Sequence, residues 1–368
     1  MEKQGEQREL AARIVAEITR LAAPLGRPVR FMEVCGTHTV SIFRAGLRQL
    51  LPETVELVSG PGCPVCVTPD SYMDQAIAYA GQPDVILTTF GDMLKVPGST
   101  SSLNEARAAG ADVRVVYSPL DSLPIAAANP DKKVIFLAVG FETTAPTAAA
   151  TVLAAEQQGL GNFFVLSAQK LVPPALRLLL TDNAARVDGF ILPGHVAVVT
   201  GTDAFAFLPQ EYHMPGVVTG FEPLEILRSI YRLAQQVAAG EARVENEYGS
   251  VVRREGNPAA RAVLSRVYET VDAEWRGLGM IPQSGLAVNA AYRRFDIGAV
   301  QPVAVTSVPK KTACRCGEVL RGLVNPRECP LFGKACVPEH AVGPCMVSVE
   351  GVCAAWYKYG GGRFHYGK

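Results

Sequence analysis

The chain has 368 residues, of which 48% are hydrophobic and 19% charged, which is the composition of a folded protein long enough for two or three domains. Its 35 basic and 35 acidic side chains give a formal net charge of +0 at pH 7, which excludes an electrostatic footprint for nucleic acid or an anionic membrane. No apolar run is long enough to span a bilayer and the amino terminus lacks a signal-peptide pattern, so we expect a cytoplasmic protein.

The amino-terminal part predicts a helix, a strand, a second helix and a second strand. Apolar residues at helical spacing predict an amphipathic helix over residues 6–23, followed by strands at 29–34 and 55–58 with a helix over 40–51 between them. The sequence Cys-Gly-Thr-His-Thr at 35–39 lies between the first strand and the second helix. In α/β proteins, a loop from the carboxyl end of a strand to the start of a helix is where ligands bind.

Cys35 is the first candidate for chemistry. The amino terminus of a helix and the nearby His38 imidazole are both expected to favour the thiolate over the thiol. This predicts a nucleophile or a metal ligand. The alternative is a half-buried small residue beside a hydrogen-bonded histidine.

A second cysteine loop follows the next strand. Cys63 and Cys66 form a Cys-x-x-Cys in which Pro64 stiffens the loop, and we expect Thr68 to cap the helix that follows. This spacing is typical of a dithiol–disulfide switch. The alternative is a zinc site that combines these two cysteines with Cys35 and His38.

Regular alternation of strands and helices continues for another 150 residues or so. Strands are predicted at 84–90, 113–117, 133–139, 163–167 and 188–192, with helices such as 102–109 and 147–158 between them. This pattern predicts parallel sheets covered on both faces. Segments 82–98 and 132–146 look alike, which suggests two similar α/β domains that face a central cleft.

Loops rich in glycine and proline are expected at that cleft, at residues 90–99, 140–146, 193–196 and 220–223. The same residue types are also ordinary in turns and helix caps. None of the loops is a nucleotide signature, and no Gly-x-Ser-x-Gly is present, so a P-loop enzyme, a dinucleotide oxidoreductase and an α/β hydrolase are not expected.

The composition changes after Gly240. A charged connection over 242–256 is followed by a predicted helix over 258–276, with Trp275 near its end, and by a stretch rich in glycine and proline. We therefore predict an α/β fold with two similar parallel-sheet domains, at 1–130 and 131–240, and a smaller, mostly helical and loop iron–sulfur domain at 241–368.

The last fifty or so residues contain six of the nine cysteines, at Cys314, Cys316, Cys329, Cys336, Cys345 and Cys353. An odd number of cysteines in a reducing compartment favours metal ligation or redox chemistry over a disulfide framework. Thiolates select zinc or iron–sulfur clusters, and the spacing here is wider than the paired knuckles of a zinc ribbon. A [4Fe–4S] cluster needs four of the six, which leaves two for a redox-active disulfide.

Together these motifs resemble the HypD family of [NiFe]-hydrogenase maturation factors, and the resemblance covers essentially the whole chain. It rests on residues 35–39, 60–66, 90–93, 140–146, 193–196, 329–333 and 343–353. The resemblance implies a scaffold for the Fe(CN)2CO group, which works with the chaperone HypC and receives cyanide from HypE together with HypF.

The resemblance also implies roles for individual residues. Cys35 would bind the iron under assembly and share it with the amino-terminal cysteine of HypC, with His38 close by and Cys63 and Cys66 as a dithiol in the cleft. A soft thiolate ligand suits iron that carries cyanide and carbon monoxide. The residues expected to contact the bound group are Thr37, Thr39, Glu142 and His195, of which the two threonines would hydrogen-bond the cyanide nitrogens.

The tail would hold a [4Fe–4S] cluster through Cys314, Cys329, Cys336 and Cys353. By similarity to ferredoxin–thioredoxin reductases, in which a redox cysteine lies next to a ligand in a Cys-x-Cys, Cys316 and Cys345 would form the redox disulfide. The expected order is cluster, then dithiol, then Cys35, with a tail that does not itself line the iron site. The alternative function is a cluster-driven thiol–disulfide oxidoreductase that has no iron-scaffold role.

Overall fold

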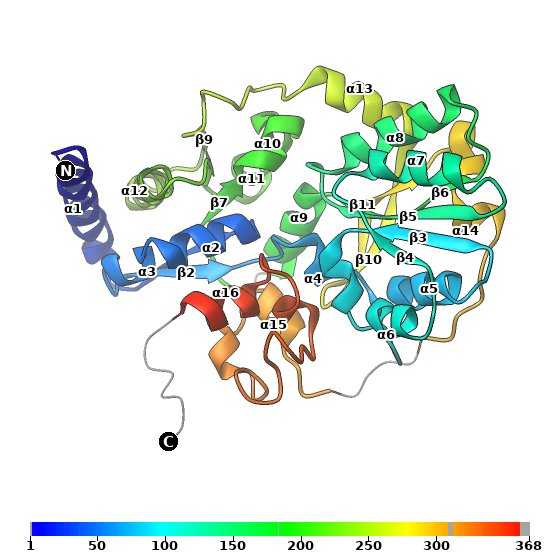
Figure 1. Cartoon of the computed structure of the whole chain (residues 1–368). Coiled ribbons are helices and arrows are strands. Elements are labelled where there is room, and N and C mark those ends of the chain that lie inside the picture. Colours follow the sequence, from blue (N-terminus) through cyan, green and yellow to red (C-terminus); the bar gives the residue numbers. More distant parts are fainter. Residues whose placement is uncertain (1, 183, 308–311, 361–368) are drawn as a thin grey trace.

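The computed structural model describes residues 2–182, 184–307 and 312–360, and these residues form an α/β protein with two sheets (Figure 1). The strand order is β2-β1-β7-β8-β9 in the first sheet and β10-β11-β6-β5-β3-β4 in the second. The first sheet is parallel throughout, whereas β10 and β11 run antiparallel in the second, which is therefore mixed. No helix in the described ranges combines the length and apolar character needed to cross a membrane.

The first sheet is buried on both faces because its strands alternate apolar side chains between two cores. Phe31 packs with helices α1 and α12, while its neighbour Met32 points into the core shared with the tail. Its strands are β1 (Val29–Glu33), β2 (Val55–Ser59), β7 (Gly189–Pro193), β8 (Gly216–Thr219) and β9 (Val244–Asn246). The helices of this half are α1 (Glu2–Ala22), α2 (Gly36–Arg44), α3 (Leu47–Leu50), α10 (Gly194–Thr200), α11 (Phe207–Tyr212) and α12 (Pro223–Ala239).

The second sheet shows the same alternation. Phe136 packs under α7, α8 and α13, and its neighbour Leu137 packs on the side of α5 and α6. The strands are β3 (Val85–Thr89), β4 (Val113–Val115), β5 (Lys133–Gly140), β6 (Phe163–Lys170), β10 (Tyr268–Trp275) and β11 (Gly279–Val288). The helices are α5 (Asp70–Ala80), α6 (Leu103–Ala108), α7 (Ser122–Ala128), α8 (Ala145–Gln157), α13 (Pro258–Val267) and α14 (Ile297–Val300).

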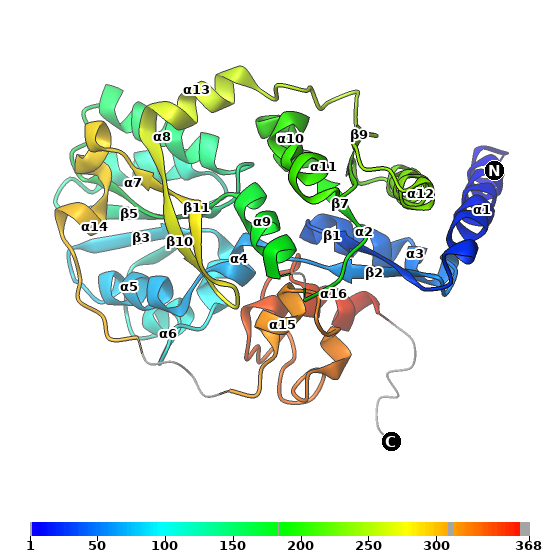
Figure 2. The ribbon, with the colours of Figure 1, turned by 180° about the vertical axis from the view of Figure 1, so that it is seen from behind.

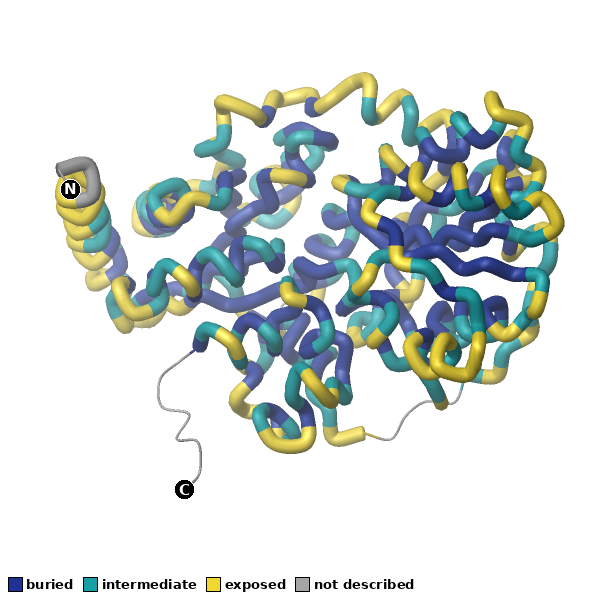
Figure 3. Tube along the Cα trace, in the orientation of Figure 1, coloured by how far each residue is buried: buried dark blue, intermediate teal, exposed yellow. Residues whose placement is uncertain are grey.

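Two helices lie between the half of the molecule built on the first sheet and the half built on the second. They are α4 (Pro64–Val67) and α9 (Val172–Asp182), and both views show them there (Figures 1 and 2). Helix α4 contacts β5 of the second sheet, and α9 contacts β11 while it packs into the core of the first sheet. The central strands of both sheets are largely buried, whereas β10 and β11 carry exposed residues, as do the outer helices and loops (Figure 3).

The strands expected between residues 29 and 192 all form, but two helices differ from expectation. The helix expected over 40–51 starts at Gly36 and breaks at Gly46, whose φ of 66° begins the short α3. The helix expected over 258–276 ends at Val267, and residues 268–275 form β10 instead. Thr270 and Val271 favour an extended backbone, and pairing with β11 extends the second sheet, so residues 268–288 are not part of a helical third region.

The chain leaves the first sheet after β2 and returns to it at β7. Strands β3 and β4 therefore share a sheet with β5 and β6, and the two sheets do not correspond to residues 1–130 and 131–240. The similar segments 82–98 and 132–146 supply the neighbouring strands β3 and β5 of one sheet. The pattern of apolar residues along the chain identifies each strand. It does not show which other strands lie next to that strand in a sheet.

The tail packs beneath the first sheet (Figure 1). It contains α15 (Cys316–Leu320) and α16 (Val352–Tyr359), and α16 packs on α2, where Trp356 makes an edge contact with Phe43 at 5.0 Å between ring centroids. The remaining short turns are η1 (Ala23–Leu25), η2 (Gly91–Lys95), η3 (Pro119–Asp121), η4 (Thr202–Phe205), η5 (Ala290–Phe295), η6 (Pro326–Glu328) and η7 (Pro344–Met346).

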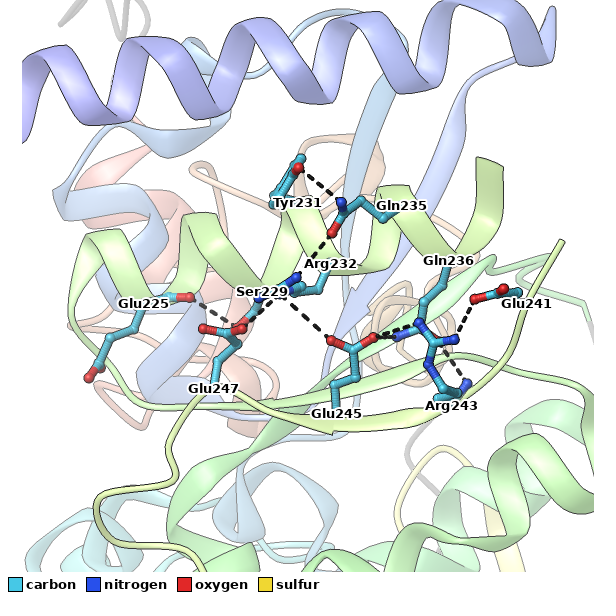
Figure 4. A network of polar contacts seen from close by, with 10 residues as sticks. All are labelled: Glu225, Ser229, Tyr231, Arg232, Gln235, Gln236, Glu241, Arg243, Glu245 and Glu247. Carbon is cyan, nitrogen blue, oxygen red and sulfur yellow. Dashed lines mark hydrogen bonds and ion pairs between the residues drawn. The ribbon is translucent and has the colours of Figure 1, made fainter. Parts of the chain in front are cut away.

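A charged network closes the outer edge of the first sheet, at β9 (Figure 4). Glu245 accepts a hydrogen bond of 2.9 Å from Gln236 and pairs with Arg243, while Arg232 donates to Glu247 at 2.9 Å. Charged side chains on an edge strand discourage pairing with another chain. The charged side chains at this edge pair with one another, so we assign them a structural role.

Candidate metal and thiol site

The loops at the carboxyl ends of strands from both sheets meet in the middle of the molecule. Helix α4 follows β2 of the first sheet and α9 follows β6 of the second, and both lie between the sheets (Figures 1 and 2). This is the position at which α/β proteins place their ligands.

Cys35 lies directly between β1 and α2, in an extended conformation. The Gly36 N–H donates a hydrogen bond of 3.0 Å to the Gly62 carbonyl in the neighbouring loop. A Cβ at Gly62 would lie 2.4 Å from the Cys35 backbone nitrogen, so only glycine fits there. This close approach holds the Cys35 loop against the loop that carries Cys63.

The Cys35 thiol does not have the lowered pKa that the sequence suggested. Burial raises the pKa of Cys35 to about 11, and the charge of Glu350 raises it further, against hydrogen bonds from the Thr37 and His38 backbone that lower it. The effect of burial on the pKa of Cys35 is larger than the effect of the helix amino terminus. The Cys35 side chain is therefore a thiol when no metal is bound. A bound metal cation reverses this balance because it stabilises the thiolate.

His38 is turned away from Cys35. Its Nε2 lies 2.9 Å from the Gly220 carbonyl oxygen, and its ring stacks on Phe221 at 4.7 Å. Burial lowers the pKa of His38 to about 4, so the ring is neutral and Nε2–H donates to that carbonyl. His38 therefore anchors the loop after β8. The exposed His195 also packs against Phe221, at 4.1 Å.

The zinc site considered from Cys35, His38, Cys63 and Cys66 is not formed, because His38 bonds to Gly220 instead. No group of three or more histidine, cysteine, aspartate or glutamate side chains in the described ranges is arranged to hold a single metal ion.

Glu350 is a site residue that the sequence reasoning missed. The Thr37 hydroxyl donates a hydrogen bond of 2.7 Å to Glu350 Oε1, and a Cβ at Gly36 would lie 2.3 Å from the Glu350 carbonyl oxygen. The tail therefore does line the Cys35 site, contrary to expectation. The available signal was the position of Glu350 within the 343–353 segment, three residues before Cys353.

The hydroxyls of the two candidate threonines have different surroundings. Thr37 faces Glu350, as described above, whereas Thr39 is buried and its hydroxyl lies 3.4 Å from the Cys35 carbonyl oxygen. Of the two threonines, Thr37 is therefore the less buried.

Cys63 and Cys66 are both buried at α4, where Cys63 precedes the first residue and Cys66 lies within the helix. Thr68 donates back to the Pro64 carbonyl at 2.9 Å, so it does not cap α5 as expected. The Cys66 thiol donates a hydrogen bond of 3.8 Å to the Pro344 carbonyl. The neighbouring Cys345 thiol lowers the pKa of Cys66, but Cys63 and burial raise it, and the pKa lies well above the usual value.

Cys345 connects this dithiol to the rest of the tail. Its thiol lies next to those of Cys316, Cys353 and Cys66. The Cys314 and Cys316 sulfurs both lie close to Gly343, where a Cβ would be 2.7 Å from each. We call this set the cysteine line: Cys63, Cys66, Cys345, Cys316, Cys314 and Cys353.

A small cavity lies at the tail end of the cysteine line. Its cysteine lining consists of Cys314, Cys316, Cys329, Cys336 and Cys353. The Val342 N–H donates to the Cys336 sulfur at 3.4 Å, a contact that suits a thiolate ligand. The four predicted ligands thus share one cavity that Cys345 does not line, and the soft donor set fits an iron–sulfur cluster, whose sulfur ligands stand farther apart than those around one ion.

Glu142 lies in a different part of the centre. It lines a mostly apolar cavity of about 620 Å³ formed by residues of α9, α10, α13, β10 and β11, and none of its lining residues is a cysteine. Its Oε1 accepts a hydrogen bond of 2.9 Å from the Val172 N–H, and burial raises the pKa of Glu142 to about 7. Glu142 is therefore not grouped with Cys35.

Comparisons of the sequence with known proteins find relatives that match nearly the whole chain. A family model described as "HypD: Hydrogenase formation hypA family" matches residues 9–360. A hydrogenase maturation factor HypD from Rhodobacter capsulatus is 46% identical over 363 residues, 96% of each chain, and one from Escherichia coli is 48% identical over 334 residues, 90% of each chain. A putative hydrogenase expression/formation protein from Methanocaldococcus jannaschii is 41% identical over 354 residues, 96% of this chain and 98% of its own.

Proposed function

The chain belongs to the HypD family of hydrogenase maturation factors, and from this premise we propose that Cys35 holds the iron while the Fe(CN)2CO group of [NiFe]-hydrogenases is assembled. The observation that carries the proposal is the contact between Gly36 and Gly62, which joins the Cys35 loop to a continuous line of thiols. Iron is the proposed substrate of this site. The Cys35 loop, which would bind the iron, contacts the loop of Cys63 and Cys66, whose thiols would supply electrons.

Cys35 supplies the soft ligand. Because its resting state is a thiol, binding iron releases one proton. Thr37 and Glu350 lie beside Cys35, and the Thr37 hydroxyl, whose one proton is donated to Glu350 Oε1, would donate to a cyanide nitrogen only by leaving that carboxylate. His38 acts on the loop after β8. Partial burial lowers the pKa of His195, and the charge of Glu350 acts against this decrease.

The tail is the proposed cluster domain, with Cys314, Cys329, Cys336 and Cys353 as ligands. When bound, a [4Fe–4S] cluster supplies electrons one at a time. Cys316 and Cys345 are the proposed redox pair. They lose two electrons and two protons when they form a disulfide and regain them when it is reduced. The contact between Cys345 and Cys66 joins this pair to the dithiol in the centre.

The proposed partners are the chaperone HypC, which shares the iron, and HypE, which delivers cyanide made with HypF. Val349 is 70% exposed and adjoins Glu350, so an apolar side chain is available beside the Cys35 loop. We place the HypC contact there. The proposed location is the cytoplasm.

Iron counting tests the scaffold. Protein purified anaerobically with HypC should contain iron in excess of its acid-labile sulfide, and Cys35→Ala should lose that excess while its sulfide content is unchanged. Ser41→Ala, on the same helix, is the matched control and should keep it. Equal excess iron in wild type and Cys35→Ala would remove Cys35 from the proposal.

A second candidate function is favoured by the Cys66–Cys345 contact alone. In a thiol–disulfide oxidoreductase without a scaffold role, the dithiol would reduce disulfides of other proteins and Cys35 would be a third switch thiol. Disulfide reduction by Cys35→Ala at the wild-type rate, combined with no excess iron in the wild type, would favour this alternative.

A further inference from the structure

The cavity that Glu142 lines has no role in the proposed iron chemistry, and we call it the Glu142 cavity. Its volume of about 620 Å³ is in the range of sites that bind small molecules. Its walls come from α10 in the half built on the first sheet, from α13, β10 and β11 in the half built on the second, and from α9 between them (Figures 1 and 2). Binding sites for small molecules are common at such a boundary.

Two buried oxygen atoms on these walls have no hydrogen-bond partner. Glu142 is 2% exposed and Tyr268, the first residue of β10, is 4% exposed. Glu142 Oε1 accepts a hydrogen bond from the Val172 N–H, but within the described part of the chain neither Glu142 Oε2 nor the Tyr268 hydroxyl has a partner. A buried polar atom without a partner is costly and therefore rare. Two such atoms on one cavity indicate a ligand that bonds to both.

The charge of the cavity indicates the chemical class of that ligand. Three charged residues line it, namely Glu142, Asp203 and Arg261. The last two are exposed and have partners, because Asp203 pairs with Arg254 and Arg261 donates to the Glu255 carbonyl. The buried charge is therefore that of the Glu142 carboxylate. Burial raises the pKa of Glu142 to about 7, and a cation placed beside the carboxylate would stabilise its ionised form.

We propose that the Glu142 cavity binds a small organic amine, whose ammonium group donates hydrogen bonds to Glu142 Oε2 and to the Tyr268 hydroxyl oxygen. An ammonium group fits this pair of oxygen atoms because it has three N–H donors and no acceptor. The apolar body of the amine would pack against Leu171, Val199 and Leu264. Binding is non-covalent and requires no iron, so the inference goes beyond the proposed function.

The test is a calorimetric titration of the full-length protein at pH 8, where Glu142 is mostly ionised. The amine probes are phenethylamine and the larger tryptamine, and the matched probes are 2-phenylethanol, which is neutral, and phenylacetate, which is an anion. Phenethylamine should bind at least about tenfold more tightly than 2-phenylethanol, because a charged donor forms the stronger hydrogen bond. Phenylacetate should not bind, because its charge has the same sign as that of Glu142.

Variants test whether the amine binds at these two oxygen atoms. Tyr268→Phe keeps the ring and should weaken amine binding about fivefold, while the thermal unfolding midpoint is unchanged because the hydroxyl has no partner to lose. Glu142→Gln keeps an acceptor for the Val172 N–H but removes the charge, and should weaken binding about thirtyfold. Ser265→Ala is the matched control, because this cavity-lining hydroxyl already donates to the Ala262 carbonyl.

Several results would overturn the inference. These are an absence of binding by both amines, equal affinities for phenethylamine and 2-phenylethanol, or wild-type affinity for the amine in both Tyr268→Phe and Glu142→Gln. A loss in Ser265→Ala as large as that in Tyr268→Phe would also overturn it, because packing would then be responsible. Cys35→Ala should bind the amines as wild type does, so the failure of this inference is distinguishable from the failure of the iron scaffold.

Discussion

The Thr37 hydroxyl donates a hydrogen bond of 2.7 Å to Glu350 Oε1, across 313 positions of sequence. This bond joins the loop of Cys35 to the cysteine tail. Glu350 therefore provides a carboxylate at the proposed iron site, and the tail has two roles there. It contributes to the cysteine line and it lines the proposed iron site.

The first prediction concerns the charge of Glu350. In apo protein, Glu350→Gln should lower the pKa of Cys35 below about 11, because a negative charge that disfavours the thiolate is removed. Cys35 should therefore react faster with iodoacetamide at pH 8 to 9, as measured by peptide mass spectrometry. Glu53→Gln, at an exposed position, is the control. A slower reaction in Glu350→Gln would contradict the assigned sign.

The second prediction concerns Gly62. In Gly62→Ala the new methyl group would lie 2.4 Å from the Cys35 nitrogen, and the backbone must move to admit it. We expect a loss of about 1–3 kcal/mol in the free energy of unfolding, measured in urea. Gly161→Ala is the matched control, because no atom lies within 4 Å of the added Cβ. Equal stability of the two variants would show that the loops are not tightly packed.

The third prediction concerns the pH dependence of stability. The pKa of Glu142 is raised by burial from 4.5 to about 7, so the folded protein keeps this proton over a range in which the unfolded chain has released it. The stability from protonated Glu142 is present below pH 4.5 and is lost as pH rises toward 7. Relative to Glu142→Gln, wild type should lose about 3 kcal/mol between pH 4 and 8.

Urea denaturation of wild type and Glu142→Gln at both pH values measures this difference. Glu53→Gln removes an exposed carboxyl and controls for the change in net charge. If the stability difference between wild type and Glu142→Gln is the same at both pH values, Glu142 ionises in the folded protein as readily as in water.

The fourth prediction assigns the tail cysteines. Cys314→Ser, Cys329→Ser, Cys336→Ser and Cys353→Ser should each lose iron and acid-labile sulfide, because each removes a thiolate from the shared cavity. Cys345→Ser should keep both, since Cys345 lies outside the cavity and contacts Cys66. Cys316 lines the same cavity, but Cys316→Ser should also keep both, because the cluster needs four ligands and Cys316 is the proposed redox partner of Cys345. Loss of the cluster in that variant would contradict the ligand assignment.

Much of this arrangement is readable from local sequence. Short, nearly continuous runs of apolar residues identify the strands from residue 29 to 192, and the cysteine loops at strand ends follow from the same pattern. The hairpin of β10 and β11 was missed because the residues after Val267 continue a helix-like pattern, and the sheet with which β11 pairs is distant in sequence.

The details of the site depend on contacts that no spacing reveals. His38 was expected near the Cys35 sulfur, yet one turn of helix directs its ring to Gly220. Glu350 reaches the site only because the tail folds back on the loops of the first sheet. The pKa of Cys35 rises because its sulfur is buried in the folded protein, and the charge of Glu350 adds to the increase.

The central claim is that the Cys35 sulfur holds iron that carries cyanide and carbon monoxide. Infrared spectroscopy of the protein purified anaerobically with HypC tests it most directly. The account predicts cyanide and carbon monoxide stretching bands in wild type and in Ser41→Ala, and their loss in Cys35→Ala. Bands of wild-type intensity in Cys35→Ala, or their absence from a well-loaded wild-type complex, would contradict it.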